Sequence, residues 1–137
     1  MIDVENMVVD AVYQAVKTQY PNAEVTSEYK DIPSSFPCVS IMEEDNYTLK
    51  RTQDNDLHEH HANVFYSVNV YSNKKSGKKA EARAIMNIVD NTLQGIKFTR
   101  TFMSPIKNID PSIYRITARY EAIIEEKRGN TYQVYRK

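Results

Sequence analysis

The histidines are the residues whose spacing most directly suggests chemistry. All three lie in one polar stretch, as His58, His60 and His61. On an extended strand His58 and His60 point the same way, and such a pair can supply two ligands to a metal ion. A catalytic zinc needs a third protein ligand, and the spacing matches no zinc-enzyme motif. We therefore interpret the stretch as a solvated hairpin tip and expect no metal and no cofactor.

Acid–base and nucleophilic catalysis have little support. The run Glu43-Glu44-Asp45 lies on a predicted strand, so its carboxylates should alternate between two faces rather than converge in a pocket. Cys38 follows Pro37 in an apolar run without a positive neighbour, which is typical of a core side chain. No serine-hydrolase motif or phosphate-binding loop is found. We expect no catalytic residues and no enzyme activity.

Composition narrows the range of partners. The 137 residues suffice for one ordinary domain. The chain is neutral, with 18 Lys and Arg against 18 Asp and Glu, whereas a sequence-independent nucleic-acid binder needs net positive charge. Its apolar runs are far shorter than the roughly 18 residues that a membrane span requires. We therefore expect neither a specific nucleic-acid partner nor a membrane.

The distribution of charge is more informative than any motif. Within residues 24–45, every charged side chain except Lys30 is acidic. Within residues 74–83, every charged side chain except Glu81 is basic. A neutral protein with an acidic edge and a basic edge could join copies of itself head to tail. The alternative, of equal weight, is that the lysines only keep a long loop soluble. The predicted subunit interface comprises Glu24, Glu28, Glu43, Glu44 and Asp45 on one copy, and Lys74, Lys75, Lys78, Lys79 and Arg83 on the next.

Two helices are predicted from apolar residues that recur every three or four positions. The first spans residues 2–19 and is stopped by Pro21. The second spans residues 79–94, with Gly95 in the position of a C-cap glycine. Its predicted apolar face consists of Ala80, Ala84, Ile85, Ile88, Val89 and Leu93.

Strands are predicted at residues 23–29, 38–42 (with an extension through Leu49 left open), 62–71, 96–103 and 112–124. In the clearest of these strands the residues of the two faces alternate strictly, with Val64, Tyr66 and Val68 on one face of the strand over residues 62–71. In residues 112–124, Ile116, Ala118 and Tyr120 oppose Arg115, Thr117 and Arg119. Residues 131–135 could add a last short strand.

The predicted order is α-β-β-β-α-β-β. This indicates a single α+β domain over residues 1–137, a mainly antiparallel sheet with two helices packed on one face. The polar segment 47–61 is expected to be a mobile hairpin loop that becomes ordered against a partner. Residues 126–137 are expected to form a C-terminal extension. The loop residues predicted to contact a partner are Arg51, Asp54, Asp56, His58, His60 and His61.

Several stretches resemble the tail terminator proteins of long-tailed phages and of phage-tail-like particles from Gram-positive bacteria. They are residues 36–41 (Phe-Pro-Cys-Val-Ser-Ile), 63–73 (ending Val-Asn-Val-Tyr-Ser-Asn), 77–80, 88–90 and 95–100. The similarity covers roughly residues 1–125 and rests on patterned rather than catalytic segments. The predicted order of elements is similar to the terminator fold.

The resemblance implies a ring, usually of six copies, that caps the head-proximal end of the tail tube and stops its polymerisation. The implied partners are further copies of the chain, the tail tube protein, and a head connector, collar or sheath protein. The implied location is the virion or tail-like particle, assembled in the cytoplasm of the bacterial host. The nearest alternative is a head–tail connector, neck or minor capsid subunit; a distant one is a small metal-dependent enzyme using residues 58–61.

A ring that passes DNA must not retain phosphate, because each neutralised phosphate adds affinity. We therefore expect an acidic or neutral bore lined by some of Asp54, Asp56, Glu59 and residues 43–45, with the basic residues at subunit contacts or the outer rim. The expectation disappears for a headless particle.

Overall fold

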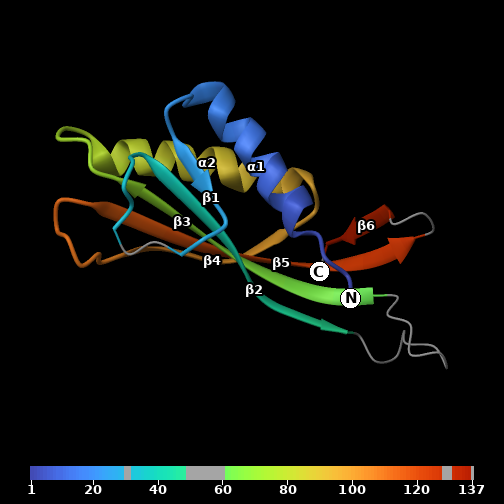
Figure 1. The fold of residues 1–137 in the computed structure, drawn as a ribbon. Coiled ribbons are helices and arrows are strands. Elements are labelled where there is room, and N and C mark those ends of the chain that lie inside the picture. The colour runs from blue at the N-terminus through green and yellow to red at the C-terminus, as the bar shows by residue number, and fades with distance from the viewer. Residues whose placement is uncertain (30–31, 49–60, 128–130, 137) are drawn as a thin grey trace.

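The computed structural model describes residues 1–29, 32–48, 61–127 and 131–136 (Figure 1). It is an α+β domain in which two helices accompany a six-stranded sheet. The elements in chain order are α1 (Glu5–Gln19), β1 (Glu24–Thr26), β2 (Cys38–Thr48), β3 (His61–Ser72), α2 (Lys78–Gly95), β4 (Thr99–Ile106), β5 (Tyr114–Lys127) and β6 (Thr131–Tyr135). The predicted fold class and element order are confirmed, with β6 as a further strand at the end.

The sheet is mostly antiparallel, with strands in the order β1-β2-β3-β5-β4. β1 is the exception, since it pairs with β2 in parallel through Glu24 to Thr26. β4 pairs with β5 from Arg115 to Glu121, and β6 pairs with the end of the same strand from Ile123 to Lys127. β3 pairs with β5 over nearly its whole length, so these two strands form the centre of the sheet.

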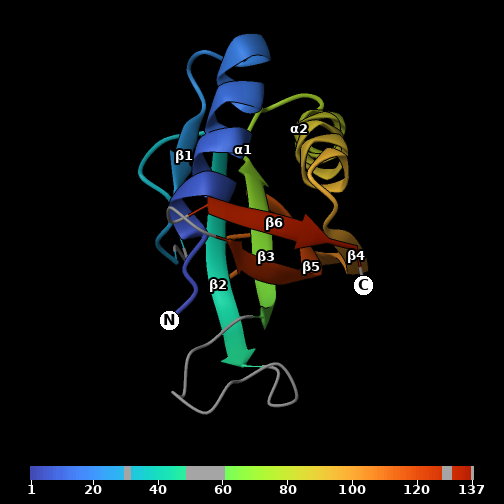
Figure 2. The ribbon, with the colours of Figure 1, turned by 90° about the vertical axis from the view of Figure 1, so that its right-hand side faces the viewer.

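Both helices cover the same face of the sheet, as predicted (Figures 1 and 2). α1 buries Val8, Val12 and Val16, spaced four residues apart, because that spacing keeps side chains on one side of a helix. The sheet contributes the alternate apolar positions of β3 and β5, such as Tyr66 and Tyr120. The core therefore lies between the helices and one face of the sheet, and the opposite face carries no helix in the described chain.

The apolar face of α2 is displaced from the predicted one. Ala80 and Ala84 are exposed, whereas Ala82 and Met86 are buried. The buried stripe is Ala82, Ile85, Met86, Val89, Asp90 and Leu93. Alanines carry too little apolar area to reveal which side of a helix faces inward, and the buried acid on this stripe hid the true periodicity.

The turn that follows α2 also differs from the prediction. Lys97, not Gly95, takes the left-handed backbone conformation, with a φ of 72°. The amide of Phe98 donates to the Leu93 carbonyl at 2.9 Å, which satisfies one of the carbonyls left unpaired at a helix end. Phe98 is buried by this turn, and β4 therefore begins at Thr99 rather than at residue 96.

Two predicted boundaries need correction. Tyr47, Thr48 and His61 are strand residues, and the Tyr47 ring stacks on Phe65 with centroids 6.2 Å apart. Of the predicted loop 47–61, residues 49–60 lie outside the described part of the chain. The stretch 126–137 is no mere extension, because it includes the end of β5 and all of β6, whose Tyr132 and Val134 pack against the core.

Candidate assembly surfaces

The face of the sheet opposite the helices is a surface that the fold leaves to a partner. Its centre consists of small polar side chains, because the positions that alternate with the core residues are polar on the central strands. They are nonetheless buried: Ser67, Asn69 and Thr117 are all at most 6% exposed. The Thr117 hydroxyl donates to the Val68 carbonyl at 3.3 Å. Two arginines of β5 flank this centre.

Arg115 is held firmly within the face. Its Nε donates to the Asn69 Oδ1 at 3.0 Å. Its guanidinium carbon lies 5.4 Å from the ring centroid of Tyr71 and 5.7 Å from that of Tyr29, within the range of a cation–π contact. This arginine therefore acts as a rigid part of the surface.

Arg119 is freer and lies beside a hollow. Its guanidinium carbon is 5.3 Å from the Phe102 ring centroid, and its Nε is 3.7 Å from Glu44 Oε2. The side chain is 57% exposed. Together with Asp45, Phe65, Thr101 and Glu44 it lines a shallow depression of about 440 Å³. Aromatic residues and arginine are enriched at the centres of protein interfaces, and this depression has that composition.

The predicted acidic residues do not form one patch. A β-bulge shifts the pairing of β2 with β3 between Glu43 and Asp45. Glu43 pairs with Tyr66 and Asp45 with Phe65, so Glu44 is an extra residue on β2 without a counterpart on β3. Glu43 faces the helices, where its Oε1 accepts hydrogen bonds from the Tyr66 hydroxyl and the Asn46 amide, both at 3.3 Å. Glu44 and Asp45 line the depression on the other face.

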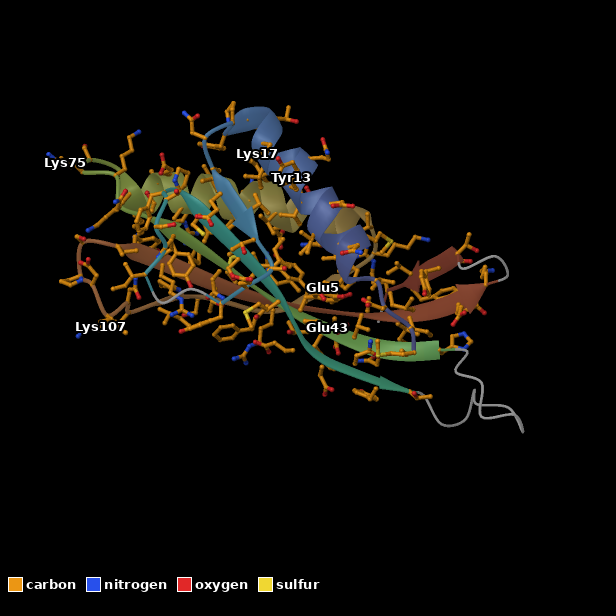
Figure 3. The ribbon with its side chains drawn as sticks, viewed as in Figure 1. Glu5, Tyr13, Lys17, Glu43, Lys75 and Lys107 are labelled. Atoms are coloured by element: carbon orange, nitrogen blue, oxygen red, sulfur yellow. The ribbon has the colours of Figure 1, made fainter. Side chains whose placement is uncertain are left out.

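The position of Glu43 perturbs its titration. Burial raises the pKa of Glu43 above its ordinary value, and the two hydrogen bonds oppose that rise. Asp3 and Glu5 at the start of the chain add a smaller rise by repulsion. Figure 3 shows Glu5 and Glu43 close together below the first turn of α1. Burial and the charge of Glu43 likewise raise the pKa of Tyr66.

The other two predicted acids lie along the β1 edge of the sheet. Glu28 is exposed beyond the end of β1. Glu24 is half-buried within β1, and its buried Oε2 has no hydrogen-bond partner among the described residues. Neither residue lines the depression, so only Glu44 and Asp45 of the predicted acidic set occur there.

The predicted basic residues cluster better, but they divide into three environments. Lys74, Lys75 and Lys79 are exposed where β3 leads into α2. Figure 3 shows Lys75 at one end of the molecule, toward which Lys107 also lies. The Lys78 ammonium donates to the carbonyls of Pro111 (3.4 Å) and Ser112 (3.3 Å), so this lysine ties the start of α2 to the loop between β4 and β5. We call the exposed Lys74, Lys75 and Lys79 the basic end.

Arg83 lies beyond the basic end, at a groove between α2 and β4. The groove has a volume of about 270 Å³, and Arg83, Asp90 and Arg100 are among the residues that line it. Asp90 accepts from the Tyr120 hydroxyl at 2.7 Å, the Arg100 Nη1 at 3.0 Å and the Gln94 amide at 2.8 Å. This buried network connects α2 to the sheet. The pKa of Tyr120 is raised, mainly by burial and further by its hydrogen bond to Asp90.

Most of the predicted partner-contacting loop lies outside the described residues, namely Arg51, Asp54, Asp56, His58 and His60. His61 is described: its Nε2 is 3.4 Å from Glu125 Oε2 on the paired strand. In the residues that the structure does describe, no group of three or more His, Cys, Asp and Glu side chains could hold a metal ion.

The sequence patterns did not single out the two arginines of β5 or the α2–β4 groove as surfaces. A signal for the arginines was present, since Arg115 and Arg119 occupy the polar face of the strand predicted over residues 112–124. No local signal could reveal the groove, because its residues come from three separate elements.

Known proteins match this chain in structure rather than in sequence. No protein-family model matches the chain, and a search of curated proteins finds no match either. Among solved structures, the bacteriophage SPP1 gp17 protein matches with 18% identity over 92% of each chain and a TM-score of 0.40. In the described part of the chain, neither helix has the length and apolar character to cross a membrane.

Proposed function

We propose that this protein is a structural subunit of a phage tail or phage-tail-like particle, a terminator that forms a ring on the head-proximal end of the tail tube. The similarity of residues 36–41, 63–73 and 95–100 to tail terminators supports this class of protein. The α+β fold, in the order expected for that class, supports it as well.

The observation that carries the proposal is the separation of two complementary surfaces on one subunit. The basic end lies where β3 leads into α2, whereas the acidic depression with Glu44 and Asp45 lies on the outer face of the sheet. Contact between two different patches repeats in the same direction from copy to copy, so it yields a closed ring or an open filament. Two identical patches would instead yield a two-fold dimer.

In the proposed contact, Lys74, Lys75 and Lys79 of one subunit face Glu44 and Asp45 of the next. Exposed ion pairs contribute only about 0–1 kcal/mol each, but their pattern guides the partner into register. Phe65, Phe102 and Tyr47, which surround the depression or lie beside it, supply the apolar area that ion pairs lack. The ring then offers other surfaces to the tail tube and to a head connector or collar.

The test compares assembly of the wild-type chain with that of a variant carrying Lys74→Glu, Lys75→Glu and Lys79→Glu. Electron microscopy and sedimentation at low salt should show rings for the wild type and monomers for the variant. Lys78 is left unchanged, since its contacts hold the fold. A control with Lys97→Glu and Lys127→Glu alters exposed charge just after α2 and at the end of β5, and it should still assemble.

Tails produced without this protein distinguish a terminator from its nearest alternative. Overlong tubes would support a terminator, because nothing would stop polymerisation. Tubes of normal length that are detached from heads would indicate a connector and overturn the proposal.

A further inference from the structure

β4 is one edge of the sheet, opposite the β1 edge. One side of β4 pairs with β5, and no strand of the described residues pairs with its other side. Two large apolar side chains on this strand are well exposed, Phe102 at 41% and Ile106 at 38%. An exposed edge presents unpaired backbone groups to which an extended segment of another chain can add. A proline late in the strand, Pro105, leaves most of that edge able to accept a partner.

The α2–β4 groove runs beside this edge. Its apolar floor is formed by Met86 of α2, Met103 of β4 and Ile116 of β5. Arg83 and Arg100 stand around that floor, one from the helix and one from the edge strand. A segment added to β4 would therefore pass directly in front of two guanidinium groups.

The charges in the groove are not balanced. Asp90 is occupied, because its carboxylate accepts from Tyr120, Arg100 and Gln94. Arg100 uses a single N–H on that carboxylate, out of the five that a guanidinium can donate. Arg83 makes no hydrogen bond or ion pair with any described residue. The groove is thus a positive site with free donors, suited to carboxylates.

We propose that the α2–β4 groove binds an extended acidic segment of a different protein, which adds to β4 as a further strand. Alternate side chains of a strand point to opposite faces. Carboxylates on the helix side would meet Arg83 and Arg100, and apolar side chains on the other face would pack beside Phe102 and Ile106. The inference does not rest on the proposed ring, whose charged contacts are the basic end and the depression; of the residues named for the two sites, only Phe102 is shared.

The probe is a fluorescent peptide of four Glu-Val repeats, titrated at low salt and followed by anisotropy. We expect it to bind and to slow hydrogen exchange in β4. Arg83→Glu should weaken binding by about tenfold, since it replaces an attraction with a repulsion. Lys97→Glu is the control, because it makes an equivalent charge change at an exposed position just after the same helix and outside the groove. It should change binding less than about twofold. Arg83 is exposed and unpartnered among the described residues, so its variant should keep the wild-type melting temperature.

Three altered peptides separate the contribution of charge from that of strand addition. Four Lys-Val repeats should not bind. Successive amides of an added strand alternate between pairing with β4 and pointing away. Methylating one alternate set of peptide nitrogens should therefore abolish binding, and methylating the other set should leave it intact.

Four results would overturn the proposal. They are failure of the Glu-Val peptide to bind, equal binding of the two methylated peptides, equal weakening by Arg83→Glu and Lys97→Glu, and self-association of the protein that only Arg83→Glu abolishes. The last result would identify a second copy as the occupant. None of the four bears on ring formation by the basic end.

Discussion

Among single residues, Glu43 shows how a bulge creates an electrostatic cost. The carboxylate lies on the helix side of the sheet, near Asp3 and Glu5, although its neighbour Glu44 faces outward. Burial raises its pKa despite the hydrogen bonds from Tyr66 and Asn46. The folded state therefore favours the protonated acid, so its contribution to stability is fully present below the unfolded pKa and is lost as pH rises through the folded pKa.

We predict that Glu43→Gln stabilises the protein at neutral pH. The amide is isosteric, its oxygen can still accept from Tyr66, and it carries no charge. The gain in the free energy of unfolding should be a few tenths to about 1 kcal/mol. It should shrink as pH falls through the raised pKa of Glu43, where the wild-type carboxyl becomes protonated. Urea denaturation across this pH range measures it, with Glu44→Gln as the exposed control. A gain that is constant with pH would contradict this explanation.

Among the elements, α2 is joined to the sheet by the hydrogen bonds that Asp90 accepts from Tyr120 and Arg100. We predict that Asp90→Ala lowers the free energy of unfolding by about 2–3 kcal/mol. The variant leaves the buried Tyr120 hydroxyl and Arg100 without their acceptor, and such an unpaired donor costs about 1–3 kcal/mol. Chemical denaturation measures the loss. Asn87→Ala, at an exposed position on the same helix, should change it by less than about 0.5 kcal/mol. Equal losses for both variants would refute the role of Asp90.

β6 offers a second test of how an element contributes to the fold. Truncation after Lys127 removes Tyr132 and Val134 from the core, as well as the Arg136 contact to the Gln94 carbonyl at 2.9 Å. We predict a loss of roughly 2 kcal/mol, since each of the two apolar side chains is only half-buried. Thermal unfolding measures it. The variant Tyr135→Phe, which loses only an exposed hydrogen bond to Glu125, should melt close to the wild type. If the truncated chain is as stable as the full one, the removed residues contribute nothing to the stability of the fold, and the prediction is wrong.

Across the whole molecule, the basic end is separate from the outer face of the sheet, where Glu44 and Asp45 lie beside Arg119 and aromatic rings. We predict that assembly weakens as salt rises from about 0.05 to 0.5 M, since exposed charges are screened within a Debye length of about 10 Å or less. Sedimentation at several salt concentrations measures this. Assembly that is indifferent to salt would point instead to an apolar interface.

The bore of the proposed ring provides a further prediction. If the ring passes DNA, Lys74, Lys75 and Lys79 must lie in subunit contacts or on the outer rim, because lysines in the bore would hold phosphate. A map of the assembled ring tests this directly. Any of the three lysines projecting into the channel would contradict the assignment, whatever the number of subunits.

Local patterns along the chain were enough to predict several elements. Apolar residues four apart place α1, and strict alternation identifies the core faces of β3 and β5. The fold class follows from the order of those elements. The opposed acidic and basic segments are likewise visible as runs of charge.

Features that join residues distant in sequence could be found only in the folded chain. The bulge that gives β2 an extra residue at Glu44 depends on how β2 pairs with β3, a strand more than ten residues further along the chain. Asp90 is a buried acceptor only because β4 and β5 bring Arg100 and Tyr120 to it. The groove beside β4 arises in the same way, because three elements meet there. Pairing register and the packing of helix on sheet are long-range properties, which a periodicity along the chain does not contain.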